Sequence, residues 1–172
     1  MGPPTIEAFW TAAAGAVEEA GRLRVRVIGP APGELRYQPD RSATAIDGLV
    51  VFVCIDGRAY DGQSGFTELP GTWTCGPEAL VRGFRQAGQP LDAWNAELPP
   101  DQGIEETIAL EPDGTWRWGY RARSLFAGGE VLTTVMLDPA IGQIRSASRT
   151  DPTGDTTYGL SYTEPFPDIA LP

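Results

Sequence analysis

The chain has 172 residues, of which 41% are hydrophobic, and its five Trp, six Phe and five Tyr predict a folded core. We expect residues 1–172 to form a single domain. The formal net charge of −10 and a pI near 4.4 make nucleic acid an unexpected partner, because the chain repels phosphate backbones. The same charge favours a monomer, and no apolar run approaches the roughly 18 residues of a transmembrane helix.

Histidine and lysine are both absent, and all 13 basic residues are arginine. This composition excludes Ser-His-Asp and Cys-His catalysis, zinc sites with histidine ligands, and Schiff-base chemistry. The loop 151–155 has two aspartates but lacks the spaced ligands and the closing Glu of a calcium loop. We therefore predict a protein that is not an enzyme and that uses no cofactor and no metal.

The two cysteines, Cys54 and Cys75, allow two interpretations. An even pair without catalytic partners is typical of a disulfide, and hence of an oxidising compartment. The alternative is a pair of buried free thiols. We favour the disulfide and an extracytoplasmic location, either secreted or attached to the cell envelope. No signal peptide or lipidation cysteine is visible near the start, so we expect any export signal or anchor to lie in a removed segment.

The first half of the chain predicts one helix followed by several strands. Helical spacing of apolar residues over 6–20, with Thr5 before it and Gly21 after it, predicts an amphipathic helix. Its expected apolar face holds Ile6, Phe9, Trp10, Ala13, Val17 and Ala20. Alternation over 22–27 predicts a strand with arginines on one face. The remaining expectations are a short strand at 34–38, a polar connection at 40–47, a central strand at 48–55, and a return at 58–61 after the turn Asp56-Gly57.

Residues 62–76 are rich in Gly and Thr and give no element, and Pro77 then opens a second helix expected over 78–87. Three prolines make 89–103 a predicted loop. The last part predicts successive antiparallel hairpins, with strands at 104–110, 115–125, 130–137, 143–150 and 156–163. Trp116, Trp118 and Tyr120 share one face of the second of these strands, and Arg117, Arg121 and Arg123 share the other.

These elements predict the α+β class: an antiparallel curved sheet of about seven to nine strands, forming a half-open β-barrel covered by two or so helices. Two helices cannot fill so wide a sheet, so a ligand cavity is expected inside. Its predicted lining is Val51, Val53, Leu80, Phe84, Trp116, Trp118, Tyr120, Val131 and Val135. The simpler interpretation of the aromatic residues among them is an ordinary packed core.

The order of elements resembles the LolA/LppX-like family of bacterial lipoprotein carriers and lipoproteins, to which RseB-like sensor domains are similar. The resemblance rests on the helix leading into an Arg-rich strand, on Asp56-Gly57 and Tyr60, on Trp73 before the helix that Pro77 opens, and on the hairpin around Asp138-Pro139 with the closing residues 165–172. It implies a half-barrel with a cavity for acyl chains, export, often a lipid anchor, and no catalytic residues.

Three functions follow as hypotheses. The first is a protein that binds an apolar ligand such as a lipid, which implies contact with a membrane or a protein partner. The second is a sensor or regulatory ectodomain that uses the same fold to bind a protein. The third is a β-barrel cyclase-type enzyme on an apolar substrate, with Asp56, Asp61 or Glu130 as the acid. Each of these carboxylates lies at a predicted turn, so a structural role competes with catalysis.

Overall fold

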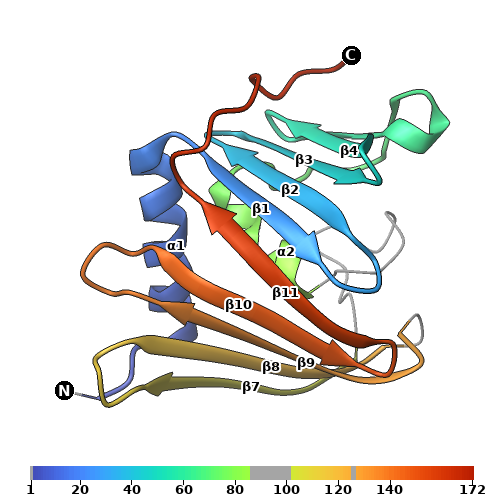
Figure 1. Ribbon diagram of the computed structural model, residues 1–172. Coiled ribbons are helices and arrows are strands. Elements are labelled where there is room, and N and C mark those ends of the chain that lie inside the picture. Colours follow the sequence, from blue (N-terminus) through green and yellow to red (C-terminus); the bar gives the residue numbers. More distant parts are fainter. Residues whose placement is uncertain (1, 86–101, 125–126) are drawn as a thin grey trace.

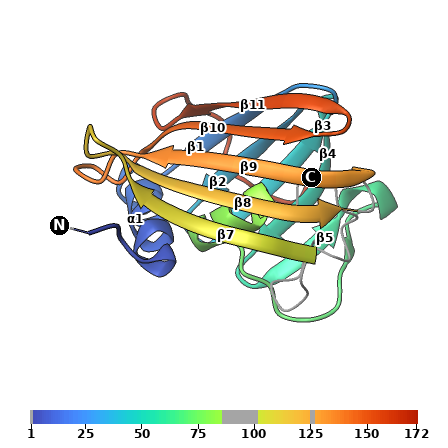
Figure 2. The same ribbon diagram turned by 90° about the horizontal axis from the view of Figure 1, so that it is seen from below.

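The structure is a computed structural model that describes residues 2–85, 102–124 and 127–172. Its strands form one open antiparallel sheet in the order β6-β5-β4-β3-β2-β1-β11-β10-β9-β8-β7. The predicted class, an α+β fold with a curved half-open sheet, is therefore confirmed. The two halves of the sheet are turned relative to each other (Figures 1 and 2), as expected when strand twist accumulates across many strands.

The strands lie close to their predicted positions, but the sheet has eleven of them instead of seven to nine. Strands that follow each other in sequence pair with each other, except β6 and β7, which form the two edges of the sheet. In addition, β1 pairs with β11 and so joins the two halves. Their bounds are β1 Leu23–Ile28, β2 Gly33–Gln38, β3 Arg41–Ile46, β4 Leu49–Ile55, β5 Arg58–Asp61, β6 Thr67–Glu68, β7 Gln102–Leu110, β8 Trp116–Ser124, β9 Gly129–Leu137, β10 Ile144–Asp151 and β11 Gly154–Ser161.

The helix α1 (Ile6–Ala20) has the predicted limits. The Thr5 hydroxyl accepts a hydrogen bond from the Ala8 amide, and Gly21 ends the helix with a positive φ of 76°. The predicted apolar face is buried or half-buried except for Ala20, which is exposed, whereas Ala16 is buried. Both helices lie on the same side of the sheet, with α2 (Leu80–Arg85) behind β1 and β2 in Figure 1.

Several expectations require correction. Residues 41–46 are a strand, β3, and not a polar connection, because Asp47-Gly48 forms a tight hairpin turn in which both residues have positive φ. In place of the expected helix at 78–87, the structure has a 3-10 turn, η2 (Pro77–Ala79), followed by the short α2. The last residues of the expected helix, 86–87, lie outside the described residues. Strand β7 begins at Gln102, inside the predicted loop 89–103, most of which also lies outside the described residues.

The segment 62–76, for which no element was predicted, contains the 3-10 turn η1 (Gly62–Ser64) and the short edge strand β6. At the start of this segment, Asp61 of β5 caps η1 by accepting a hydrogen bond from the Gln63 amide at 2.9 Å. The disulfide between Cys54 and Cys75 attaches the end of this segment to β4. The segment that leads into η2 and α2 is thereby fixed to the sheet.

The C-terminal tail after β11 crosses the outer face of the sheet, opposite the helices (Figure 1). Phe166 and Ile169 are buried there against Val53 of β4. The Gln38 side chain donates to Asp168 and accepts from the Ile169 amide, and Arg41 donates to the Ile169 carbonyl at 2.7 Å. The tail therefore covers β4 from outside, which explains why this antiparallel strand is apolar on both faces.

Candidate ligand-binding cavity

A cavity of about 140 Å³ lies between α2 and the inner face of the first half of the sheet. Antiparallel pairing brings its wall together in successive cross-strand rows. The first row holds Tyr37 and Ser42, and the second holds Leu35, Thr44 and Phe52. The third row extends from Tyr158 of β11 through Val27 and Gly33 to Ile46. The cavity therefore follows the strands from the disulfide end of β4 toward the β1–β2 turn.

The wall is apolar over most of its length and opens at one end. Ala31, Pro32 and Ile46 are exposed to solvent, and they form the rim. Gly33 lies at the centre of the third row, where an added Cβ would come within 2.7 Å of the Ala45 carbonyl oxygen, so β2 and β3 approach closely there. Alternation places Leu35 and Thr44 on this inner face and Arg36 on the outer one. Such a wall suits an apolar ligand that enters at the rim and lies along the strands.

The closed end of the cavity is polar. Arg82 and Gly83 of α2 face Tyr37 and Ser42 of the sheet there. The backbone of Gly83 lies so close to Tyr37 that an added Cβ would be only 2.3 Å from the tyrosine hydroxyl. A glycine at position 83 is thus required for α2 to lie directly above the tyrosine.

The nine residues predicted to line a cavity are placed elsewhere, and none contacts this one. Five of them belong to the main core cluster, with Trp116 packed against it: Leu80, Phe84, Trp118, Tyr120 and Val135. Val51 lies in the cluster beside the disulfide, Val53 lies beneath the C-terminal tail, and Val131 is buried in β9. Ligand contact by these nine residues stays a prediction.

The residues that line this cavity were not identified from the sequence, because β3 was not predicted as a strand. Ser42 and Thr44 are polar, and without the pairing of β2 with β3 nothing indicates that they face inward. The signal that was available is Asp47-Gly48, a strong hairpin sequence between two runs of strand-forming residues.

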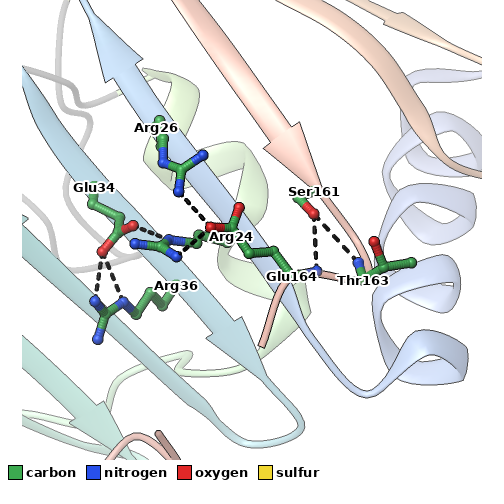
Figure 3. A network of polar contacts seen from close by, with 7 residues as sticks. All are labelled: Arg24, Arg26, Glu34, Arg36, Ser161, Thr163 and Glu164. Carbon is green, nitrogen blue, oxygen red and sulfur yellow. Dashed lines mark hydrogen bonds and ion pairs between the residues drawn. The ribbon is translucent and has the colours of Figure 1, made fainter. Parts of the chain in front are cut away.

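The outer face of the same strands has a different character. Glu34 pairs with Arg24 and Arg36, and Glu164 at the start of the tail pairs with Arg24 and Arg26 (Figure 3). Ion pairs on this half-exposed surface contribute little to stability individually. Their geometry does show that these outward arginines are matched with carboxylates, so they form no free anion site.

The cysteines form the disulfide, which fits an oxidising compartment. Within the described residues, no group of three or more Cys, Asp or Glu side chains is arranged to hold a metal ion. No helix in the described part of the chain is long and apolar enough to cross a membrane.

We expect the protein to lose stability at alkaline pH because tyrosines are buried. Burial raises the pKa of Tyr37 to about 12, and burial also raises the pKa of Tyr162, whose hydroxyl accepts from the Ile144 amide, to about 12. A raised pKa in the folded state gives stability that is complete below the unfolded pKa of about 10 and is lost as the pH rises through 12. Urea unfolding at pH 8, 10 and 11.5 should show this decrease.

The loss should amount to at most about 3 kcal/mol for a fully buried tyrosine. Tyr162→Phe provides the matched control, since it removes one titrating hydroxyl and its share of the pH dependence. A free energy of unfolding that stays constant between pH 8 and 11.5 would contradict the assignment.

The fold and the cavity together define the class of this protein: an α+β half-barrel domain with an internal, mainly apolar cavity. Among solved structures, the chain is similar to the Mycobacterium tuberculosis lipoprotein LppX, with 11% identity and a TM-score of 0.42, over 95% of this chain and 99% of LppX. It is also similar to LprF from Mycobacterium bovis, with 15% identity and a TM-score of 0.40, over 99% of this chain and 98% of LprF. No protein-family model and no curated protein matches the sequence.

Proposed function

We propose that this protein is an extracytoplasmic binding protein that holds an apolar ligand, a lipid or an acyl chain, inside its half-barrel. The single observation that carries the proposal is the apolar cavity formed by three cross-strand rows of β1–β4 and β11 under α2. Its volume of about 140 Å³ is close to that of the roughly 150 Å³ apolar cavity that stays dry and binds benzene in another protein. The open rim allows a longer chain to extend into solvent.

Binding is favoured over catalysis by the positions of the candidate acids. Asp61 caps η1, Glu130 pairs with the half-buried Arg121, and Asp56 forms a turn with a positive φ. None of the three lines the cavity. The proposed function is therefore to bind and hold a ligand, with no cofactor, and the disulfide supports a location outside the cytoplasm.

Filling the cavity should weaken ligand binding. Thr44 lies in the middle row of the wall, so Thr44→Trp places a large ring where a ligand would lie. We expect this variant to weaken binding of 1-octanol, measured by titration calorimetry, by about tenfold or more, or about 1.4 kcal/mol. Thr44→Leu fills less space and should have an intermediate effect.

The matched control is Thr157→Trp, the same substitution on the exposed face of β11. This variant should bind octanol with the same affinity as the wild type. Circular dichroism checks that all variants are folded. If the wild type does not bind octanol, or if both Trp variants bind equally, the cavity is not the binding site.

A further inference from the structure

Arg82 of α2 is a buried cation in the wall of the apolar cavity. The residue is only 9% exposed, and its guanidinium lies over the rings of Phe52 and Trp73, with 5.8 and 5.7 Å to the ring centroids. Its Nη1 donates one hydrogen bond, of 2.7 Å, to the Thr74 carbonyl. Within the described residues, no Asp or Glu pairs with it, and its other N–H groups have no acceptor.

Within the described residues, nine of the 13 arginines pair with a carboxylate, and Arg82 is the one buried residue among the other four. The arginines on the outer face of the same strands, which are far more accessible to water, are paired with Glu34 and Glu164 (Figure 3). A buried charge is costly unless it is paired, because the interior screens it less than water does. Burial accordingly lowers the pKa of Arg82. The group that most needs an anion is therefore the one that faces the cavity.

Ser42 provides a second, independent observation at the same end. The residue is 5% exposed, and its Oγ has no hydrogen-bond partner among the described residues. Ser42 lies opposite Tyr37 in the first row of the wall, and both residues line the cavity with Arg82. A buried hydroxyl without a partner is destabilising, and a ligand acceptor would offset this cost.

The apolar part of the site begins at this polar end. Ile46 at the rim lies four positions after Ser42, which is roughly 13 Å along a strand at about 3.3 Å per residue. Leu35, Thr44 and Val27 lie along that path. The site therefore has a buried cationic end, an apolar length and an open rim.

We propose that the ligand is a single-chain amphiphile whose carboxylate binds Arg82 and Ser42 at the closed end, with its chain toward the rim. This inference rests on the proposed function and specifies its ligand. A carboxylate carries one negative charge, which one guanidinium balances, and its two oxygens accept from the guanidinium N–H groups and from the Ser42 hydroxyl. A doubly charged phosphate would leave one charge unbalanced in a site with a single cation.

The test compares octanoate with 1-octanol, which share a chain length but differ in the charge of the head. Titration calorimetry at pH 7 and 0.15 M salt gives both affinities for the intact wild type. We expect octanoate to bind about tenfold or more tightly than octanol, since hydrogen bonds between charged groups exceed neutral ones. In Arg82→Gln the ratio of the octanoate affinity to the octanol affinity should fall to near one, while octanol binding persists. Arg82→Lys should retain part of the preference for octanoate.

Ser42→Ala should reduce the preference by a smaller factor, and because it leaves Arg82 in place it guards against a folding defect in the Arg82 variants. Equal wild-type affinities for the two probes, or an undiminished preference in folded Arg82→Gln, would overturn the carboxylate assignment while leaving the proposed function standing. Binding of neither probe would overturn both.

Discussion

Replacing Trp118 with alanine is expected to lower the free energy of unfolding by about 4 kcal/mol, because truncating a fully buried aromatic removes its buried surface and leaves a cavity. Trp118 is completely buried in β8. Its ring contacts Trp10 of α1 edge to face at 5.0 Å and is stacked on Tyr120 at 5.6 Å. Its Nε1 donates to Glu106 of β7 at 2.9 Å. The Trp118 side chain thus connects α1 with β8 and its neighbour β7.

Urea unfolding followed by circular dichroism measures this loss. Arg117→Ala is the matched control, since the Arg117 side chain points outward from the preceding position of the same strand. This variant should change stability by less than about 0.5 kcal/mol. Trp118→Phe should be intermediate, because a ring remains but the hydrogen bond to Glu106 is lost. A loss of less than 1 kcal/mol in Trp118→Ala, as for a surface residue, would contradict the described packing of α1 on β8.

Removing the disulfide, as Cys54→Ala with Cys75→Ala, is expected to cost about 3.3 kcal/mol by the loop-entropy relation. The two cysteines are 21 residues apart, so the bond restricts a sizeable loop in the unfolded chain. The bond also attaches the segment before η2 to β4, and η2 leads into the helix that carries Arg82 and Gly83. We therefore expect the double variant to bind octanol more weakly as well as to unfold more readily.

The experiment is urea unfolding of the double variant and of the wild type with and without a reductant. Reduction should lower the stability of the wild type alone, which separates loss of the bond from loss of cysteine packing. A wild type whose unfolding is insensitive to complete reduction would contradict the structural role of the bond.

Local signals predicted the regular elements well. Thr5 and Gly21 defined α1 to the residue, and the alternation of Trp118 and Tyr120 with Arg117 predicted which face of β8 is buried. These features depend on the chain within a few residues of each position. The antiparallel class followed from them, because two helices are too few for alternating strand–helix units.

The sequence alone did not predict the wall of the cavity, because pairing between strands decides which side chains meet. Ser42 faces inward only because β3 pairs with β2 and β4. Val53 was expected in the cavity, yet the tail residues Phe166 and Ile169 cover it on the opposite face. No local pattern shows that a segment over 100 residues later in the chain makes this contact.

Arg82 was overlooked for a related reason. In sequence it is one of two arginines at the end of a short helix, where a basic residue is ordinary. Only the fold places its guanidinium against Phe52 and Trp73 and leaves it without a carboxylate partner among the described residues.

Native mass spectrometry of the purified wild type, followed by the same measurement under denaturing conditions, tests the central claim most directly. The cavity under α2 should retain an apolar small molecule, seen as an adduct in the native spectrum that disappears on denaturation. Thr44→Trp should lack the adduct, and Thr157→Trp should keep it. A wild type that has a bare mass, and that takes up neither octanol nor octanoate when they are added, would contradict the account of this protein as one that binds an apolar ligand.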